Sequence, residues 1–166
     1  MKKNLLLLLI TISLCSCDEL PFGNDVIWDV SPVEVNIYVQ DSQGNDLLSS
    51  SFEGNILKDS IYVEYGGIKF PIGVDMSEET MTRAYLAVLT GLKLRKYGNE
   101  NYLSFGEFDG TKDWNDVCSI HWGDGTSDNI RFVRDFKWAL DGSPKVKESA
   151  FYLNNEKVKG KIIIIR

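Results

Sequence analysis

The chemistry open to this chain is limited first by its histidine and cysteine residues. His121 is the one histidine among 166 residues, so neither a histidine pair nor a set of three histidines can bind zinc. Cys118 lies three positions earlier, and strand residues an odd number of positions apart point to opposite faces. This strand alone therefore cannot supply a Cys–His nucleophile pair. We expect Cys118 to be a small buried apolar residue beside Ile120 and Trp122, and His121 to face solvent.

Two acidic loops share the pattern Asp-Gly-Thr-x-Asp, one over residues 109–113 and one over residues 124–128. Aspartate and threonine oxygens can ligate Ca²⁺, and glycine permits a tight loop. Neither loop matches the twelve-residue D-x-D-x-D-G pattern of a calcium loop, and Asp-Gly is also common hairpin-turn chemistry. We therefore interpret both loops as turns and expect no metal site.

Trp114 lies in the polar stretch 111–116, where strand alternation does not account for a large apolar ring. A tryptophan flanked by aspartate and asparagine suits sugar binding, because the ring covers C–H faces while the polar neighbours bond hydroxyls. Trp114, Asp113 and Asp109 are therefore the candidate ligand-binding residues. The alternative, which we favour, is that the Trp114 ring folds back over the open end of the domain. The remaining tryptophans follow strand patterns and are expected in the core: Trp28, Trp122 and Trp138.

A catalytic pair of carboxylates, as in glycosidases, is a further possibility. It needs one protonated and one ionised acid, about 5 to 9 Å apart, on either side of a cleft. The chain has 24 aspartate and glutamate residues, so two of them in loops carry little information. We expect a protein that is not an enzyme, with no catalytic residues and no cofactor.

The N-terminal residues have the parts of an export signal. Lys2 and Lys3 give a positive start, and Leu5–Leu14 is an apolar run of ten residues. As a helix this run would rise about 15 Å, roughly half of a membrane's hydrocarbon core. It is therefore interpreted as part of a signal peptide and not as a membrane span.

Leu14-Cys15-Ser16-Cys17 resembles the lipobox of bacterial lipoproteins. The resemblance implies that residues 1–16 are a lipoprotein signal peptide and that Cys17 is acylated, which anchors the chain to a membrane. The alternative is an ordinary secretory signal with two incidental cysteines. Asp18 and Glu19 resemble the surface-export signal of lipoproteins in the Bacteroidetes. An inner-membrane retention signal and a plain solvated tether are the alternatives.

Charge and cysteine content restrict the partners and the means of stabilisation. The chain has 18 Lys and Arg against 24 Asp and Glu, a net charge of −6, and loss of residues 1–16 removes two lysines and makes it −8. Such an acidic protein is not expected to bind nucleic acid. With Cys15 removed and Cys17 acylated, Cys118 is the one remaining thiol, so no intramolecular disulfide is expected.

The elements that must position these residues are predicted to be strands. Residues 17–25 contain Pro, Gly and Asn and are expected to form a lipidated tether, which leaves 26–166 as a single domain. Val33–Gln40 alternates apolar and polar residues. Two more alternating runs meet at Gly66-Gly67, which is a hairpin signal, and Pro71 indicates that its strand lies at an edge or ends there.

The C-terminal half continues this pattern. Ile162–Ile165 is apolar at every position, so we expect it to be buried on both faces. In the run 130–138, Arg134 interrupts an otherwise apolar face. Further strands are predicted at about 102–108, 117–122 and 145–153.

The stretch 77–95 is ambiguous. Its apolar spacing fits an amphipathic helix with Ser77 as the cap, and it also fits a strand. We favour a strand from about Thr82 to Arg95, because the neighbouring segments are all strands and Gly91 would weaken a helix. One short helix near 77–90 is the alternative.

Many strands at roughly ten-residue spacing, separated by Gly, Asn and Asp turns, indicate an all-β antiparallel sandwich or barrel, of which we favour the β-sandwich. Trp122-Gly123-Asp124-Gly125-Thr126 is similar to the turn signature of PKD-type modules, which implies an Ig-like or PKD-like surface module. The chain also resembles a group of uncharacterised Bacteroides-type lipoproteins, over Trp28–Val33, Asp41–Leu48, Phe105–Gly110 and Ile120–Gly125.

These features together predict a non-catalytic lipoprotein of the outer membrane, anchored by the lipid on Cys17. Its domain is expected to face the cell surface, with the periplasm as the alternative. The predicted role is a binding or accessory module for a glycan, a host component or a protein partner. The alternative role is a structural subunit of a pilus-like surface assembly built by strand pairing.

Overall fold

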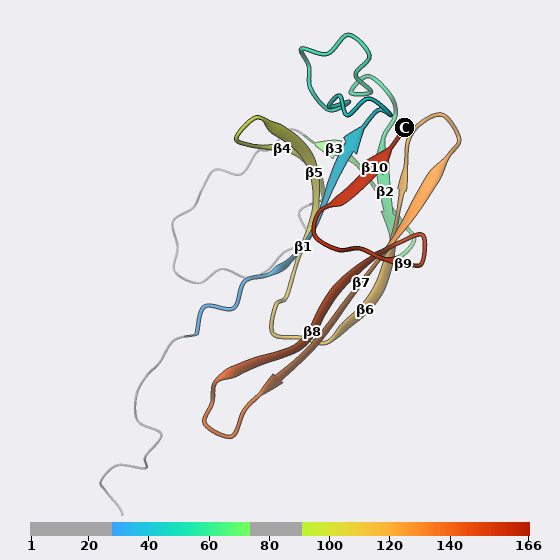
Figure 1. The fold of residues 1–166 in the computed structure, drawn as a ribbon. Helices are drawn as coiled ribbons and strands as arrows, with labels where there is room; N and C mark the ends of the chain where they lie inside the picture. The colour runs from blue at the N-terminus through green and yellow to red at the C-terminus, as the bar shows by residue number, and fades with distance from the viewer. Residues whose placement is uncertain (1–27, 74–90) are drawn as a thin grey trace, which may run out of the picture.

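The structure, a computed structural model, describes residues 28–73 and 91–166. Every regular element in these residues is a strand, which confirms the all-β prediction (Figure 1). The strands are β1 (Val33–Gln40), β2 (Tyr62–Tyr65), β3 (Ile68–Gly73), β4 (Leu92–Tyr97), β5 (Glu100–Phe108), β6 (Trp114–His121), β7 (Ser127–Trp138), β8 (Pro144–Leu153), β9 (Glu156–Lys157) and β10 (Ile162–Ile165).

These strands form one mixed sheet, in the order β10-β1-β5-β4-β3-β2-β6-β7-β8-β9, that curls into a half-barrel. The prediction of a wholly antiparallel sheet is wrong, because β1–β10 and β3–β4 are parallel pairs. The described strands are hydrogen-bonded in one sheet, so the two separate sheets of a sandwich are not confirmed.

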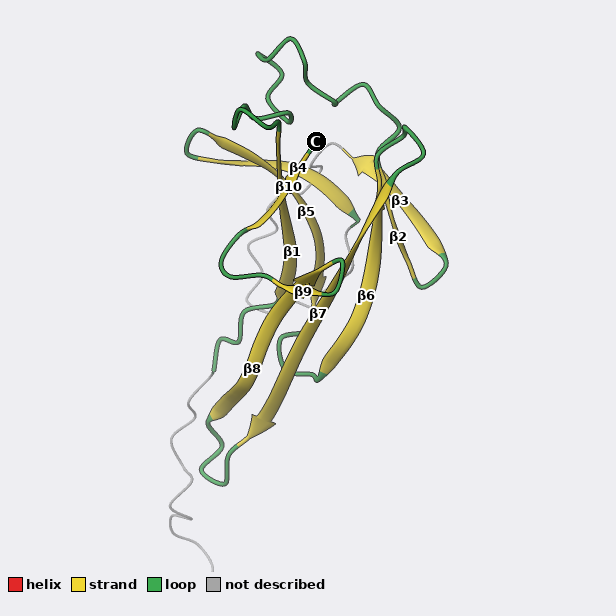
Figure 2. Ribbon diagram, turned by 45° about the vertical axis from the view of Figure 1, so that its right-hand side comes forward, coloured by secondary structure: helices red, strands yellow, loops and turns green. Residues whose placement is uncertain are grey.

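The curl brings the two ends of the sheet towards each other. The chain passes from β9, at one end of the strand order, to β10, at the other end, through residues 158–161 (Figure 2). Four residues can span at most about 18 Å from the last residue of β9 to the first of β10. This short connection keeps the two ends of the sheet close together.

Both halves of the curled sheet bury side chains in one apolar core. β1 alternates as predicted, with Val33, Val35, Ile37 and Val39 buried and the residues between them half-buried. The facing half contributes Phe132 of β7 to the same cluster, together with the buried residues Cys118, Ile120 and Trp122. This continuous core stabilises the curled arrangement mainly through burial of apolar surface.

The predicted hairpin is also confirmed. β2 and β3 pair in antiparallel register around Gly66 and Gly67, whose φ angles are +58° and +78°. Two consecutive positive φ angles favour glycine and match the twist of a tight hairpin. Pro71 pairs with Tyr62 in β2, while β4 pairs with β3 only at Ile72 and Gly73, so the other edge of β3 is unpaired at Pro71.

Three burial predictions are wrong. β10 alternates between buried and exposed, with Ile165 59% exposed, because only the face with Ile162 and Ile164 packs against the core. Trp28 and Trp138 are exposed, because each lies beyond the end of the core. Of the ambiguous stretch 77–95, residues 92–95 belong to the described strand β4. The earlier part of the favoured strand, from Thr82 to residue 90, and the alternative helix near 77–90 both lie outside the described residues.

A group of polar contacts lies at the end of the sheet where β10 finishes. We call it the Arg166 cluster. The Arg166 guanidinium lies 4.8 Å from the centre of the Trp122 ring, forms an ion pair with Asp124 and donates a 3.0 Å hydrogen bond to Thr126 Oγ1. The Trp122 indole N–H donates to Asp128 Oδ2 at 2.8 Å. Every charged group in this cluster therefore has a partner.

Candidate functional site

The three candidate ligand-binding residues lie together at the loop between β5 and β6. The Trp114 indole N–H donates a 2.7 Å hydrogen bond to the carbonyl of Asp109. The Trp114 ring lies 5.3 Å from the Phe108 ring and 6.0 Å from the Phe132 ring, measured between centroids. The ring is half-buried and packs against the core, which is the arrangement that we favoured from the sequence.

The two carboxylates beside Trp114 accept hydrogen bonds from groups of the protein itself. Asp113 Oδ1 accepts the backbone N–H of Phe136 at 2.7 Å, next to the irregularity where β7 and β8 shift register. Asp109 Oδ1 accepts both the hydroxyl and the N–H of Thr111, at 2.7 and 2.8 Å. These hydrogen bonds, the hydroxyl first, lower the pKa of Asp109. Asp109 and Asp113 thus stabilise the loop that holds Trp114.

The second Asp-Gly-Thr loop has the same geometry. Asp124 Oδ1 accepts the hydroxyl and the N–H of Thr126, at 2.6 and 2.8 Å. Asp141 and Ser143 repeat the arrangement between β7 and β8. The described residues include no group of three or more His, Cys, Asp or Glu side chains placed to hold a metal ion. These geometries agree with our interpretation of the two loops as turns.

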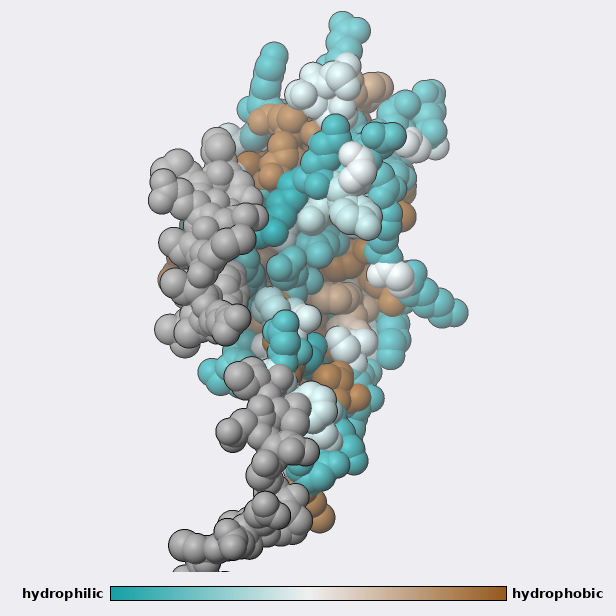
Figure 3. Space-filling view, turned by 90° about the vertical axis from the view of Figure 1, so that its left-hand side faces the viewer, coloured by the Kyte–Doolittle hydropathy of each residue, from teal (hydrophilic) through white to brown (hydrophobic). Residues whose placement is uncertain are grey.

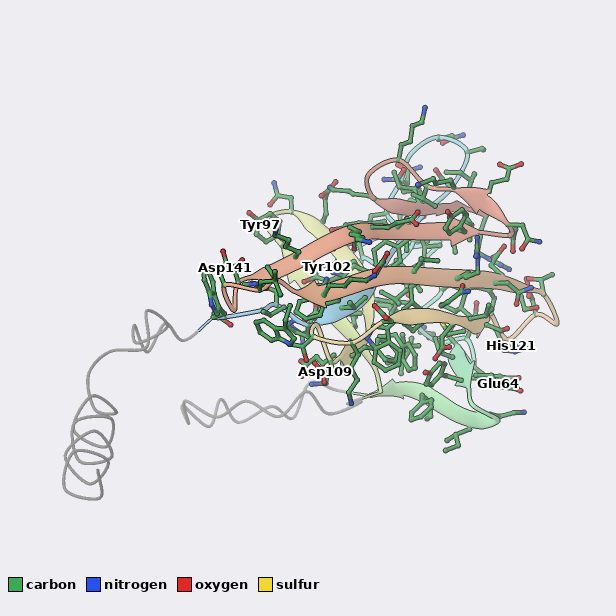
Figure 4. All side chains as sticks on the ribbon, turned by 90° about the horizontal axis from the view of Figure 1, so that it is seen from below. Glu64, Tyr97, Tyr102, Asp109, His121 and Asp141 are labelled. Carbon is green, nitrogen blue, oxygen red and sulfur yellow. The ribbon has the colours of Figure 1, made fainter. Side chains whose placement is uncertain are left out.

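His121 and Cys118 lie on opposite faces of β6, as predicted. Cys118 is fully buried, and burial raises the pKa of its thiol to about 12. The His121 ring stacks on Tyr62 with 4.5 Å between ring centroids, and its Nε2 lies 3.8 Å from Glu64 Oε2 (Figure 4). The buried thiol of Cys118 is not an activated nucleophile, since nucleophilic cysteines require a lowered pKa.

A different part of the molecule has the features of a binding site. A wide hollow of about 480 Å³ opens between β1 and the β7–β8 half of the sheet, and we call it the polar hollow. One wall comes from β1 and the residues just before it, and the other from β7 and β8. It is lined by Ser31, Pro32, Val33, Glu34, Asn36, Arg134, Ser149 and Phe151.

Two polar atoms in the walls of the polar hollow are buried and without a hydrogen-bond partner in the described part of the chain. They are Asn36 Oδ1 from β1 and Arg134 Nε from β7. Arg134 pairs in register with Trp114 on one side and Ser149 on the other, so all three side chains lie on the core-facing side of the sheet. A buried polar atom without a partner is unfavourable, and such atoms often mark a functional site.

The backbone around the polar hollow is also incompletely paired. β10 pairs with β1 only from Ile37 onward, and β9 pairs with β8 only at Tyr152 and Leu153. Beyond these pairs, the Val158 N–H donates to the Phe151 carbonyl at 2.9 Å. Among the described strands, no strand pairs with the edge of β1 before Ile37 or with that of β8 before Phe151. The polar hollow lies between these two edges, so polar side chains and unpaired strand edges meet in one place.

Comparison with known proteins does not assign this site. No protein-family model matches the chain, and neither a curated protein nor a solved structure is significantly similar to it. The described residues contain no helix long and apolar enough to cross a membrane.

Proposed function

We propose that this chain is a lipid-anchored protein of the bacterial cell envelope that binds a ligand or partner protein and catalyses no reaction. The N-terminal sequence supports the anchor, through the signal peptide 1–16 and acylation of Cys17. The polar hollow supports the binding role. Residues 122–126 are similar to the turn signature of PKD-type adhesion modules, and we count this similarity among the grounds for the proposed binding role.

The observation that carries the binding proposal is the presence, in the walls of one hollow, of two buried polar atoms without a partner, Arg134 Nε and Asn36 Oδ1. A ligand that fills the hollow must present an acceptor to the guanidinium and a donor to the amide oxygen. Glycans with carboxylate groups and extended peptides both meet this requirement. An accessory module on the cell surface encounters both classes.

Binding can be tested with an array of acidic and neutral glycans, probed with the purified chain and with Arg134→Gln. We expect wild-type binding to a subset of carboxylate-bearing glycans and loss of that binding in the variant. Lys159→Gln removes one charge from an exposed position that does not line the polar hollow and is the matched control. Equal binding by wild type and Arg134→Gln would show that the hollow is not the binding site.

The anchor has a separate test. Cys17→Ala is expected to take up no radiolabelled fatty acid in growing cells and to leave the membrane fraction. Protease treatment of intact cells then distinguishes the two orientations, because a surface protein is digested and a periplasmic one is protected until lysis. Undiminished labelling of Cys17→Ala would rule out Cys17 as the acylated residue.

A second function, a structural subunit assembled by strand pairing, is favoured by one specific observation. β10 ends the strand order, and its residues Ile163 and Ile165 are exposed. An uncovered apolar edge strand can accept a strand from a neighbouring subunit. Ladders of oligomers on gels of unheated samples, lost in Ile163→Lys, would support this function over the binding module.

A further inference from the structure

The end of the β7–β8 hairpin is an exposed apolar tip. Leu140, in the turn, is fully exposed, Trp138 is 53% exposed and Val146 is 45% exposed. The hairpin extends beyond the rest of the sheet (Figures 1 and 2). Hydrophobic atoms are visible at this end of the molecule in the space-filling view (Figure 3). Large apolar side chains gathered in this way mark an interaction surface.

The tip is amphipathic, with apolar side chains on one face of the hairpin and lysines on the other. Trp138 pairs with Pro144, and Phe136 with Val146, so these apolar side chains share one face of the hairpin. Lys137 pairs with Lys145 on the opposite face. Trp138 packs edge-on against Phe136, with 5.1 Å between ring centroids, and its indole N–H has no partner within the described residues.

The charge of the tip is opposite to that of the whole protein. Residues 137–147 contain three lysines and one aspartate, a local charge of +2, in a chain of net charge −6. The aspartate, Asp141, accepts hydrogen bonds from the hydroxyl and N–H of Ser143, so its carboxylate is held by the turn. A positive patch on an acidic protein suits an anionic partner surface.

The position of the tip relates it to the proposed lipid anchor. The described chain begins at residue 28, at the same end of the molecule as the tip, in the views of Figures 1, 2 and 4; Asp141 marks the tip in Figure 4. Ten residues separate Cys17 from Trp28. They can span at most about 40 Å from one to the other, so a lipid on Cys17 restricts this end of the domain to the neighbourhood of the bilayer.

We propose that the tip, residues 137–147, inserts into the headgroup region of the membrane to which Cys17 is anchored. This inference rests on the proposed lipid anchor. Leu140 enters the apolar boundary, and the Trp138 ring lies at the interface with its N–H towards headgroup oxygens. Lys137, Lys145 and Lys147 contact anionic headgroups. Two attachments, the lipid and the tip, then fix the orientation of the domain and direct the Arg166 cluster away from the membrane.

Depth-dependent fluorescence quenching tests this inference on the full, lipidated chain. The protein is reconstituted into phosphatidylethanolamine–phosphatidylglycerol vesicles whose acyl chains carry bromine near the headgroup. All samples carry Trp28→Phe, and the buried Trp122 and half-buried Trp114 act as internal references. We expect strong quenching by the brominated lipid that disappears when Trp138→Phe is added. Trp138 should also become shielded from aqueous iodide when vesicles are present.

A second measurement separates the tip from the anchor. Cys17→Ala is mixed with the same vesicles and sedimented, alone and combined with changes in the tip. Leu140→Ser should weaken vesicle binding, and each of Lys137→Gln and Lys145→Gln should weaken it about fivefold. Lys159→Gln, outside the tip, should leave binding unchanged. Fatty-acid labelling of Cys17→Ala would defeat the anchor without affecting this measurement.

Two results would overturn the inference. The first is a Trp138 that stays fully accessible to iodide and unquenched by brominated lipid in correctly reconstituted, lipidated protein. The second is self-association in sedimentation velocity that Leu140→Ser abolishes, together with no quenching by lipid. That result would assign the tip to contact between protein chains.

Discussion

Two arginines of this molecule lie next to tryptophans in very different surroundings. Arg166 lies over the Trp122 ring, forms an ion pair with Asp124 and donates a hydrogen bond to Thr126. Arg134 pairs in register with Trp114, yet its buried Nε has no partner among the described residues. The first is placed to stabilise the fold. The second does not stabilise the fold in this way, because a buried unpartnered donor does not favour the folded state, and we propose that it serves a ligand.

The same contrast extends to the regions around the two arginines. In the Arg166 cluster the charged groups are paired, and the tryptophan is fully buried with its N–H bonded. Around the polar hollow, the edges of β1 and β8 are paired over only part of their length, and the hairpin beyond it carries exposed apolar residues. Paired and unpaired polar groups are thus concentrated in different parts of one curled sheet.

The largest difference is expected for the two tryptophans. Trp122→Ala removes a fully buried ring and should lower the free energy of unfolding by about 3–5 kcal/mol. Trp114→Ala removes a half-buried ring and should cost clearly less. Urea unfolding followed by circular dichroism measures both, with Trp138→Ala as an exposed control. If Trp114→Ala is the more damaging variant, the comparison is wrong.

A smaller effect is expected at Asp113, which supports one wall of the polar hollow. Asp113→Ala leaves the Phe136 N–H without its acceptor at the irregularity between β7 and β8, and should destabilise the fold by about 1 kcal/mol. Asp113→Asn keeps an acceptor oxygen and should restore most of the loss. Hydrogen exchange at the Phe136 amide gives a local measurement. Equal exchange in wild type and Asp113→Ala would contradict this role.

The pH dependence of stability should report on the Arg166 cluster. The hydroxyl and N–H of Thr126, and then the charge of Arg166, hold the pKa of Asp124 below its ordinary value of 3.8. A lowered folded-state pKa means that the ionised carboxylate favours folding. This contribution is fully present above about pH 4 and is lost as the pH falls through the folded-state pKa.

The urea midpoint should therefore fall on acidification from about pH 6 to about pH 3, and less so in Asp124→Asn. Asp109 and Asp141 contribute in the same direction, because hydrogen bonds from Thr111 and Ser143 lower their pKa values. Identical acid curves for wild type and Asp124→Asn would show that this carboxylate does not contribute to stability.

Much of the scaffold could be predicted from the sequence because its strands alternate. The alternation of β1, the Gly66-Gly67 hairpin and the opposite faces of Cys118 and His121 are all local patterns of period two. Ile162–Ile165 has no alternation, so its sequence could not show which face is exposed. That depends on which face of the strand packs against the core, which is a property of the whole fold.

The polar hollow was harder to predict. Arg134 left one signal, since it interrupts the apolar face of its strand. Asn36 left none, because a polar residue is ordinary on the outer face of β1. The hollow exists only because the sheet curls and brings β1 close to β8, and pairing between distant strands is not encoded in any short segment.

The most direct test of this account compares Arg134→Met with Arg166→Met in urea unfolding. Arg166→Met should lower the free energy of unfolding by about 1 kcal/mol, because it removes a partly exposed ion pair and a contact with the Trp122 ring. Arg134→Met should leave stability unchanged or raise it, because an apolar side chain replaces a buried unpartnered donor. If Arg134→Met is the less stable variant, then Arg134 serves the fold, and the polar hollow loses its claim to be a binding site.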